Sequence, residues 1–166
     1  FHGRHVLITG AGSGIGAAIA RDFALSGANV TLSGRRHEPL AALAAELDQA
    51  AERKACFVAS GFDVTNAQAI STGLQTAQAA FGPVSILVNN AGEAPSAPFE
   101  KTSLEMWSQV LAVDLTGVFQ VTQAVLPDLK AYGTNARIIN IASTAGLTGY
   151  AYVSAYCAAK HGVIGL

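Results

Sequence analysis

The sequence contains little charge and little sulfur. Only 13% of its 166 residues are Asp, Glu, Lys or Arg, the net charge is −1, and no run of basic residues occurs. This composition argues against nucleic acid as a partner, because binding to phosphate backbones needs clustered positive charge. The two cysteines, Cys56 and Cys157, form neither a CxxC pair nor a metal-ligand spacing. We therefore expect no disulfide framework, no metal site and a reducing, cytoplasmic location.

The sequence also lacks a long uninterrupted apolar run. Residues 64–92 and 138–159 carry no charge, but Asn, Gln, Ser, Thr and Gly interrupt both segments. A transmembrane helix needs about 20 consecutive, mainly apolar residues. The first residues also lack the charged and then apolar pattern of a secretion signal. We therefore predict no association with a membrane.

Short apolar runs alternate with helical patterns along the whole chain. Four runs are typical of strands that are buried on both faces of a parallel sheet: residues 5–9, 29–33, 86–88 and 138–141. Apolar stripes with helical spacing lie between them: Ile15, Ile19 and Phe23; Leu40, Leu43 and Leu47; Ile70, Leu74, Ala77 and Phe81. This order predicts an α/β fold of the Rossmann type, a doubly wound parallel sheet with helices on both faces. We expect residues 1–166 to form one such dinucleotide-binding domain.

Residues 106–127 have an unusual pattern. Asp114 is their only charged residue, and apolar side chains occur on nearly every side of the expected helix. A helix of this kind is buried. We favour burial against a second subunit over burial beneath another element of the same chain.

A glycine-rich turn joins the first predicted strand to the first predicted helix. Gly10, Gly14 and Gly16 permit a tight turn, close approach of the backbone to a pyrophosphate, and close packing of helix on strand. The first helical turn, with Ser13 and Ile15, offers free N–H groups to phosphate oxygens. A turn of this composition without a ligand is the alternative, but its position between strand and helix favours a nucleotide site.

The end of the second predicted strand indicates which nucleotide is bound. Gly34, Arg35 and Arg36 stand where an NAD site has an acidic residue on the ribose 2′-OH. Arginine instead suits a 2′-phosphate through its forked donors. We therefore favour NADP(H), with Arg35 as a ligand, over NAD(H). Two considerations oppose this interpretation: Ser13 adds no second positive charge, and paired arginines are commonly just solvated.

Five motifs occur in one order along the chain: Thr9 to Gly16, Asp63-Val64, Asn89-Asn90-Ala91-Gly92, Ser143, and Tyr156 to Lys160. In these motifs, their order and their intervals the chain resembles the short-chain dehydrogenases/reductases over essentially its whole length. The resemblance implies that Asp63 and Val64 border the adenine, and that Asn90, Ala91 and Gly92 line the cofactor pocket, with Asn90 also steadying the central strand.

The same resemblance implies acid/base chemistry at the end of the chain. Tyr156 is the expected general acid in reduction and base in oxidation, and it is also expected among the cofactor-binding residues. Lys160 lies four residues later, hence on the same helical face; it is expected to bind the nicotinamide ribose and to favour the phenolate. Ser143 is expected to bind the substrate carbonyl oxygen. We predict hydride transfer between NADP(H) and a ketone or secondary alcohol, such as a 3-oxoacyl thioester or a cyclic or aryl ketone. A non-catalytic nucleotide-binding sensor or assembly protein is the alternative.

The sequence departs from the family at Asp114, where members usually have an asparagine that braces a water beside the lysine. An ionised Asp114 could pair with Lys160 and weaken its hold on Tyr156. If the backbone of residue 114 braces the water instead, the aspartate has almost no effect on activity. We favour the second alternative and count Asp114 with the catalytic set.

The second departure is the end of the chain. Family members continue with two more strands and a substrate loop, so we expect a C-terminally incomplete chain. The strand at 138–141 would then form an open apolar edge. Family members also associate as homodimers or homotetramers through helices that correspond to 106–127 and to the helix of Tyr156.

Overall fold

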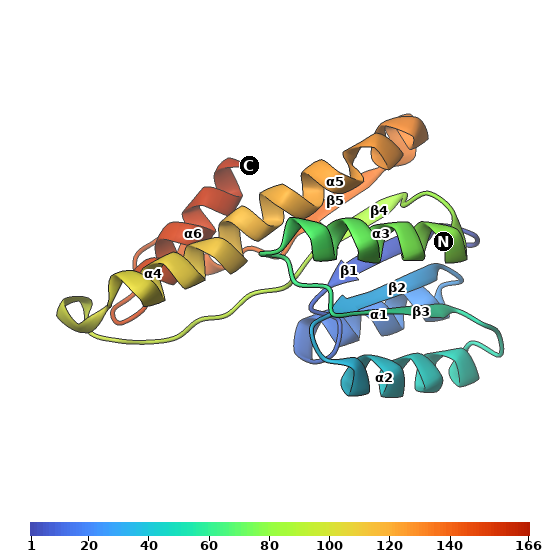
Figure 1. The fold of residues 1–166 in the computed structure, drawn as a ribbon, viewed down its shortest axis with the longest axis horizontal. Helices are drawn as coiled ribbons and strands as arrows, with labels where there is room; N and C mark the ends of the chain where they lie inside the picture. Colours follow the sequence, from blue (N-terminus) through green and yellow to red (C-terminus); the bar gives the residue numbers. More distant parts are fainter.

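Five parallel strands, in the order β3-β2-β1-β4-β5, form the centre of the structure, a computed structural model that describes residues 1–166. Helices cover both faces of the sheet (Figure 1), and the predicted Rossmann-type fold is confirmed. In chain order the strands and helices are β1 His5–Thr9, α1 Gly14–Leu25, β2 Asn29–Gly34, α2 His37–Ala50, β3 Cys56–Ser60, α3 Ala67–Phe81, β4 Ile86–Asn89, α4 Leu104–Leu111, α5 Gly117–Tyr132, β5 Arg137–Asn140 and α6 Ser154–Gly165.

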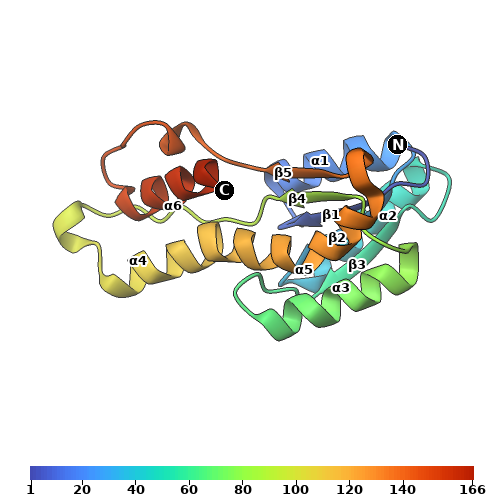
Figure 2. The same ribbon diagram turned by 90° about the horizontal axis from the view of Figure 1, so that it is seen from above.

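The central strand β1 supplies both halves of the core. Its side chains alternate between the two faces of the sheet, as the pleat requires. Val6 and Ile8 pack with α1 and α2, whereas Leu7 packs on the opposite face with α3 and α5. All three are fully buried, and burial of each contributes roughly 1.5–3 kcal/mol. Figure 2 shows the two helical layers with the sheet between them.

The predicted stripe on α1 identifies the helix but not its buried face. Ile15 is 62% exposed, while Ile19 and Phe23 are only partly buried against the core. The face that is buried consists of Gly16, Ala17, Ala20 and Ala24. The predicted helix is present, and its buried face consists of small residues because α1 packs close to the sheet.

Strand β3 is not among the strands predicted from the sequence. It lies at one edge of the sheet and pairs only with β2. Its side chains at Phe57 and Val58 are half-buried, and Ser60 is exposed. Residues 55–59, Ala-Cys-Phe-Val-Ala, are a continuous apolar run that marks this strand, and the prediction missed it.

The predicted helix at 106–127 is longer than expected and is interrupted. A π-helical turn, Ala112–Thr116, separates α4 from α5. By length and composition alone the segment Leu104–Asn135 is long and apolar enough to cross a membrane, but the core helix of a soluble protein passes the same test. One face of α5 packs on the sheet through Val121, Val125 and Leu129. Its other face leaves Phe119 and Leu126 exposed, so a subunit contact there stays a prediction.

Two features set the position of the later elements. Strand β5 pairs only with β4, and its Ile138 and Ile139 are 43% and 38% exposed. Helices α4 and α6 lie beyond the sheet (Figure 1), where Val110 of α4 packs against Ala155 and Ala159 of α6. Tyr156 and Lys160 are therefore carried outside the sheet core.

The imidazole of His5 is fully buried, and each of its ring nitrogens lies within hydrogen-bonding distance of one polar group. Nδ1 lies 2.7 Å from the Gly82 carbonyl oxygen and Nε2 lies 2.8 Å from the Thr31 hydroxyl. The carbonyl can only accept, so Nδ1 carries the proton and the Thr31 hydroxyl donates to Nε2. Burial lowers the pKa of His5, while the Gly82 carbonyl and Asp128 oppose the shift.

We predict that the neutral, hydrogen-bonded imidazole of His5 stabilises the fold above pH 6.5, the ordinary pKa of histidine. This stabilisation is lost as the pH falls below that value. Below that value the unfolded chain binds a proton that the folded chain does not, so the free energy of unfolding decreases by up to about 1.4 kcal/mol per pH unit. Urea unfolding between pH 5 and 8 measures it. A His5→Gln variant, which cannot titrate, should have a flatter profile; an unchanged slope would contradict the assignment.

Candidate active site

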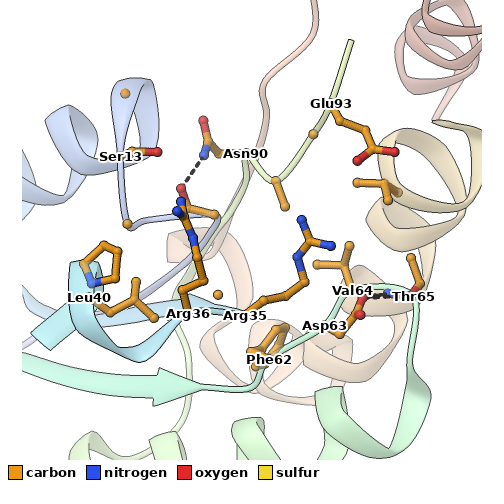
Figure 3. A pocket seen from close by; sticks show the side chains of 18 of the residues that line it. Ser13, Arg35, Arg36, Leu40, Phe62, Asp63, Val64, Thr65, Asn90 and Glu93 are labelled. Atoms are coloured by element: carbon orange, nitrogen blue, oxygen red, sulfur yellow. Dashed lines mark hydrogen bonds between the residues drawn. The ribbon is translucent and has the colours of Figure 1, made fainter. Parts of the chain in front are cut away.

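A cleft of about 530 Å³ opens at the carboxyl ends of the strands. In open α/β sheets, ligands bind at this edge where the strand order reverses, here between β1 and β4. Figure 3 shows the side chains that line it. The structure brings ten of the predicted cofactor residues together around this cleft: Gly10, Ser13, Gly14, Ile15, Arg35, Asp63, Val64, Asn90, Ala91 and Gly92.

The glycine turn and the loop after β4 are held together by Asn90. Its amide Nδ2 donates to the carbonyl oxygens of Thr9 at 3.0 Å and Gly10 at 3.2 Å, and its backbone N–H donates to the Thr9 hydroxyl. A Cβ at Gly16 would lie 2.5 Å from both Asn90 Nδ2 and the Gly10 oxygen. Gly16 is itself buried, beneath the cleft rather than on its lining. Only glycine permits this close approach.

Two free guanidinium groups lie at the cleft. Arg35 and Arg36 follow β2, are exposed, line the cleft, and take part in none of the ion pairs of the structure. Figure 3 shows both side chains extending into the cleft. Unpaired arginines in a cleft are suited to bind an anion bidentately.

The carboxylate of Asp63 is held ionised on the same side of the cleft. The main-chain N–H and the hydroxyl of Thr65 donate to it at 2.9 and 2.8 Å. These two bonds, with the charge of Arg35, lower the pKa of Asp63 below its ordinary value. The side chain is therefore a hydrogen-bond acceptor at neutral pH, which suits an exocyclic amino group.

The predicted acid/base residues lie on neighbouring elements rather than on the lining of the cleft. Tyr156 and Lys160 are on α6, with the ammonium 5.4 Å from the centroid of the phenol ring. Ser143 follows β5 and begins a short 3₁₀ turn, where its hydroxyl accepts from the Ala145 N–H at 3.1 Å. That turn packs directly on α6, because a Cβ at Gly146 would lie 2.6 Å from the Lys160 carbonyl oxygen.

Lys160 is almost entirely buried and has two polar neighbours. Its Nζ donates to the Ile141 carbonyl oxygen at 2.9 Å and lies 3.4 Å from Oδ1 of Asp114. The main chain of Glu93, which lines the cleft, donates to Oδ2 of Asp114. Asp114 therefore links Lys160 to the rim of the cleft. The pairing of Asp114 with Lys160, which was the first of the two alternatives for the aspartate at this position, occurs in the structure.

The sequence matches the family model described as short chain dehydrogenase over residues 4–166. The chain belongs to the short-chain dehydrogenase family. It is 41% identical to the D-threitol dehydrogenase of Mycolicibacterium smegmatis over 167 residues, which cover 99% of this chain and 62% of that protein. It is 40% identical to the D-beta-hydroxybutyrate dehydrogenase of Cupriavidus necator over 164 residues, which cover 99% of this chain and 62% of that protein.

A solved structure supports the same family. The F189W actinorhodin polyketide ketoreductase with NADPH superposes with a TM-score of 0.91 at 38% identity, covering 98% of this chain and 61% of that chain. The chain thus spans less than two thirds of the length of these relatives. The three differ in the substrates their names state, so family membership alone does not identify a substrate.

This short-chain dehydrogenase chain also has cleft residues that the sequence reasoning did not single out. Thr65 and Glu93 each directly follow a predicted motif, so extension of the motif by one residue would have found them. The other lining residues not predicted as ligands include Gly12, Leu40, Phe62 and Gln109. Gln109 comes from α4, far along the chain, and no local pattern marks it.

We predict that Gly16→Ala lowers the free energy of unfolding by about 1–3 kcal/mol, the usual cost of overpacking, and weakens nucleotide binding. The added methyl group would displace Asn90 and the Gly10 carbonyl. Thermal unfolding and a nucleotide titration measure the two effects. Gly12→Ala is the matched control for the unfolding measurement, because its Cβ would find only ordinary contacts, the nearest at 3.4 Å from Pro39. Equal behaviour of the two variants would refute the packing argument.

Proposed function

We propose that residues 1–166 are the nucleotide-binding and acid/base part of an oxidoreductase that transfers hydride between NADP(H) and a ketone or secondary alcohol. The observation that carries the proposal is the adjacency of two structures. Glu93 lies on the lining of a cleft that also has a glycine turn and free arginines, and Asp114 links Glu93 to the lysine beside Tyr156. Neither half would be sufficient on its own, because function resides in the site and not in the fold.

The residues at the cleft fit a dinucleotide. The glycine turn leaves space for a pyrophosphate against the N-terminus of α1, where Ser13 makes no side-chain cap and the first N–H groups are free. Asp63 and Val64 would border the adenine, and Asn90, Ala91 and Gly92 would line the nicotinamide side. The bound cofactor would supply or accept the hydride.

The side chains of α6 and of the turn after β5 would handle the proton. The Tyr156 hydroxyl would donate a proton to the developing alkoxide in reduction and accept it in oxidation. The ammonium of Lys160 stabilises negative charge on the phenol oxygen. The Ser143 hydroxyl, which accepts from the Ala145 N–H, keeps its own hydrogen free to donate to a carbonyl oxygen.

The choice of NADP(H) over NAD(H) rests on Arg35. We expect Arg35→Ala to raise the Kd for NADPH at least tenfold and the Kd for NADH less than twofold, because a charge-assisted hydrogen bond contributes about 1.5–3 kcal/mol. Fluorescence titration of the full-length protein with both nucleotides measures this. Arg21→Ala is the control, since Arg21 pairs with Glu46 at 2.8 Å outside the cleft. Equal weakening of both nucleotides would contradict recognition of a 2′-phosphate by Arg35.

The substrate class is a small-molecule ketone or its alcohol. D-threitol, D-beta-hydroxybutyrate and polyketide are the substrate classes in the names of the relatives, and all carry a secondary alcohol or ketone. We favour a 3-oxoacyl thioester or a cyclic or aryl ketone. A cytoplasmic location and a homodimer or homotetramer through the exposed face of α5 and through α6 belong to the same proposal.

We predict that Tyr156→Phe lowers turnover by 10²–10⁴, the range that general acid/base catalysis contributes, and leaves the Kd for NADPH within twofold. NADPH oxidation by the full-length protein against a panel of 3-oxoacyl thioesters, a cyclic ketone and an aryl ketone measures it. Tyr132→Phe, which alters a tyrosine beside Arg4 and outside the cleft, should keep full activity.

A non-catalytic, nucleotide-binding protein is the second candidate. It is favoured by the carboxylate of Asp114 next to Lys160, because that negative charge opposes the effect of the lysine on Tyr156. Tight NADPH binding with no turnover in either direction would select this candidate over the enzyme.

A further inference from the structure

Four charged side chains line the cleft, and they come from three different strand ends. Arg35 and Arg36 follow β2, and Asp63, on which the charge of Arg35 acts, follows β3. Glu93 is the fourth and follows β4. The first three thus lie together at one end of the cleft, and Glu93 lies apart from them.

The side chain of Glu93 is half-buried and has no partner. Its carboxylate takes part in no ion pair, and its main-chain N–H, not its side chain, makes its hydrogen bond to Asp114. Figure 3 shows the Glu93 side chain at one side of the cleft, with Ser13 at the other. Removal of a carboxylate from water without a compensating partner is unfavourable. An unpaired, half-buried acid on the lining of a cleft therefore indicates a cationic group on the ligand.

The main chain fixes Glu93 beside the acid/base residues. Its N–H donates to Oδ2 of Asp114 at 3.0 Å, and Oδ1 of Asp114 lies 3.4 Å from Nζ of Lys160. Lys160 in turn lies beside the ring of Tyr156. Because Asp114 and Lys160 are both buried and pair with each other, their charges largely cancel. Glu93 is then the uncompensated charge at this end of the cleft.

The proposed reaction itself supplies a cation at this end. A ring that exchanges hydride with a carbonyl beside Tyr156 has to lie between the cleft and α6, and hence next to Glu93. Reduction of a ketone transfers one hydride from the cofactor to the carbonyl carbon and one proton from Tyr156 to the carbonyl oxygen. Loss of the hydride changes the nicotinamide from neutral to positively charged. The two redox forms of the nucleotide therefore differ in charge at this end and not at the adenine end.

We propose that Glu93 distinguishes the two redox forms of the cofactor, because its carboxylate binds the positively charged, oxidised nicotinamide more tightly than the neutral, reduced one. The inference rests on the proposed function. The same carboxylate stabilises the positive charge that develops on the nicotinamide as hydride departs. In the complex with bound cofactor, Glu93 therefore favours reduction of the ketone over oxidation of the alcohol.

The test is nucleotide binding by the full-length protein without substrate. Glu93→Gln keeps the shape of the side chain and the N–H that Asp114 accepts, and it removes the charge. We expect the Kd for NADP⁺ to rise about fivefold and the Kd for NADPH to stay within twofold, the effect of one charge pair in a partly exposed site. Added salt should reduce the difference between the two proteins, because it screens the charge. If the protein prefers NAD(H), the same ratio is measured with NAD⁺ and NADH.

Two further variants separate a local charge from the total charge of the protein. Glu100→Gln removes an exposed acid from the same segment but outside the cleft, and should leave both Kd values unchanged. Asp63→Asn removes an acid from the other end of the cleft. Since the adenine is the same in both redox forms, this variant should change both Kd values by the same factor.

The outcomes distinguish this inference from the proposed function. A ratio of the two Kd values that Glu93→Gln leaves unchanged would overturn the inference and leave the proposed function standing. An effect of Glu93→Gln confined to the KM of a ketone that carries an amino group would assign the carboxylate to the substrate, and would overturn the inference as well. Failure of the unmodified protein to bind any of the four nucleotides would remove the proposed function and the inference with it.

Discussion

The close contact between the loop after β4 and the glycine turn after β1 is the constraint on which the site depends. The amide of Asn90 donates to two consecutive carbonyl oxygens, those of Thr9 and Gly10, and no side chain fits between at Gly16. Because the two strands are neighbours in a parallel sheet, their carboxyl ends open on the same side. The contact turns two separate loops into one wall of the cleft, and the free N–H groups of α1 are thereby directed into it.

Charge in the site is distributed unevenly, and each part has a separate physical cause. The guanidinium groups at the end of β2 are exposed and unpaired, so they are available to an anion from solution. The carboxylate of Asp63 is kept ionised by hydrogen bonds from Thr65. Asp114 and Lys160, in contrast, are both buried and form an ion pair at 3.4 Å. The outer part of the site thus holds charges open to solvent, and the inner part holds charges that are paired and closed to it.

Much of the fold and of the site can be predicted from the sequence. Four of the strands follow from apolar runs, and the residues of the cleft from motifs such as Asn89-Asn90-Ala91-Gly92, because these features are local. Strand β3 also has an apolar run, at residues 55–59, which the prediction missed. The buried face of α1 depends on how closely the helix approaches the sheet, which is a property of the packed structure. The contact of Asp114 with Lys160 joins residues that are far apart in the chain, so no local periodicity predicts it. Only the resemblance to the family indicated it.

The π-helical turn at Ala112–Thr116 has a mechanical consequence. A wider turn of this kind accommodates one residue more than an α-helical turn does, and one residue corresponds to a rotation of about 100° about the helix axis. The halves of the long helix are therefore out of phase: α4 directs Val110 to α6, while α5 directs Val121 and Val125 to the sheet. Deletion of a single residue here would bring the halves into one continuous phase. One of the two contacts would then be lost, although the deletion changes no residue in either of them.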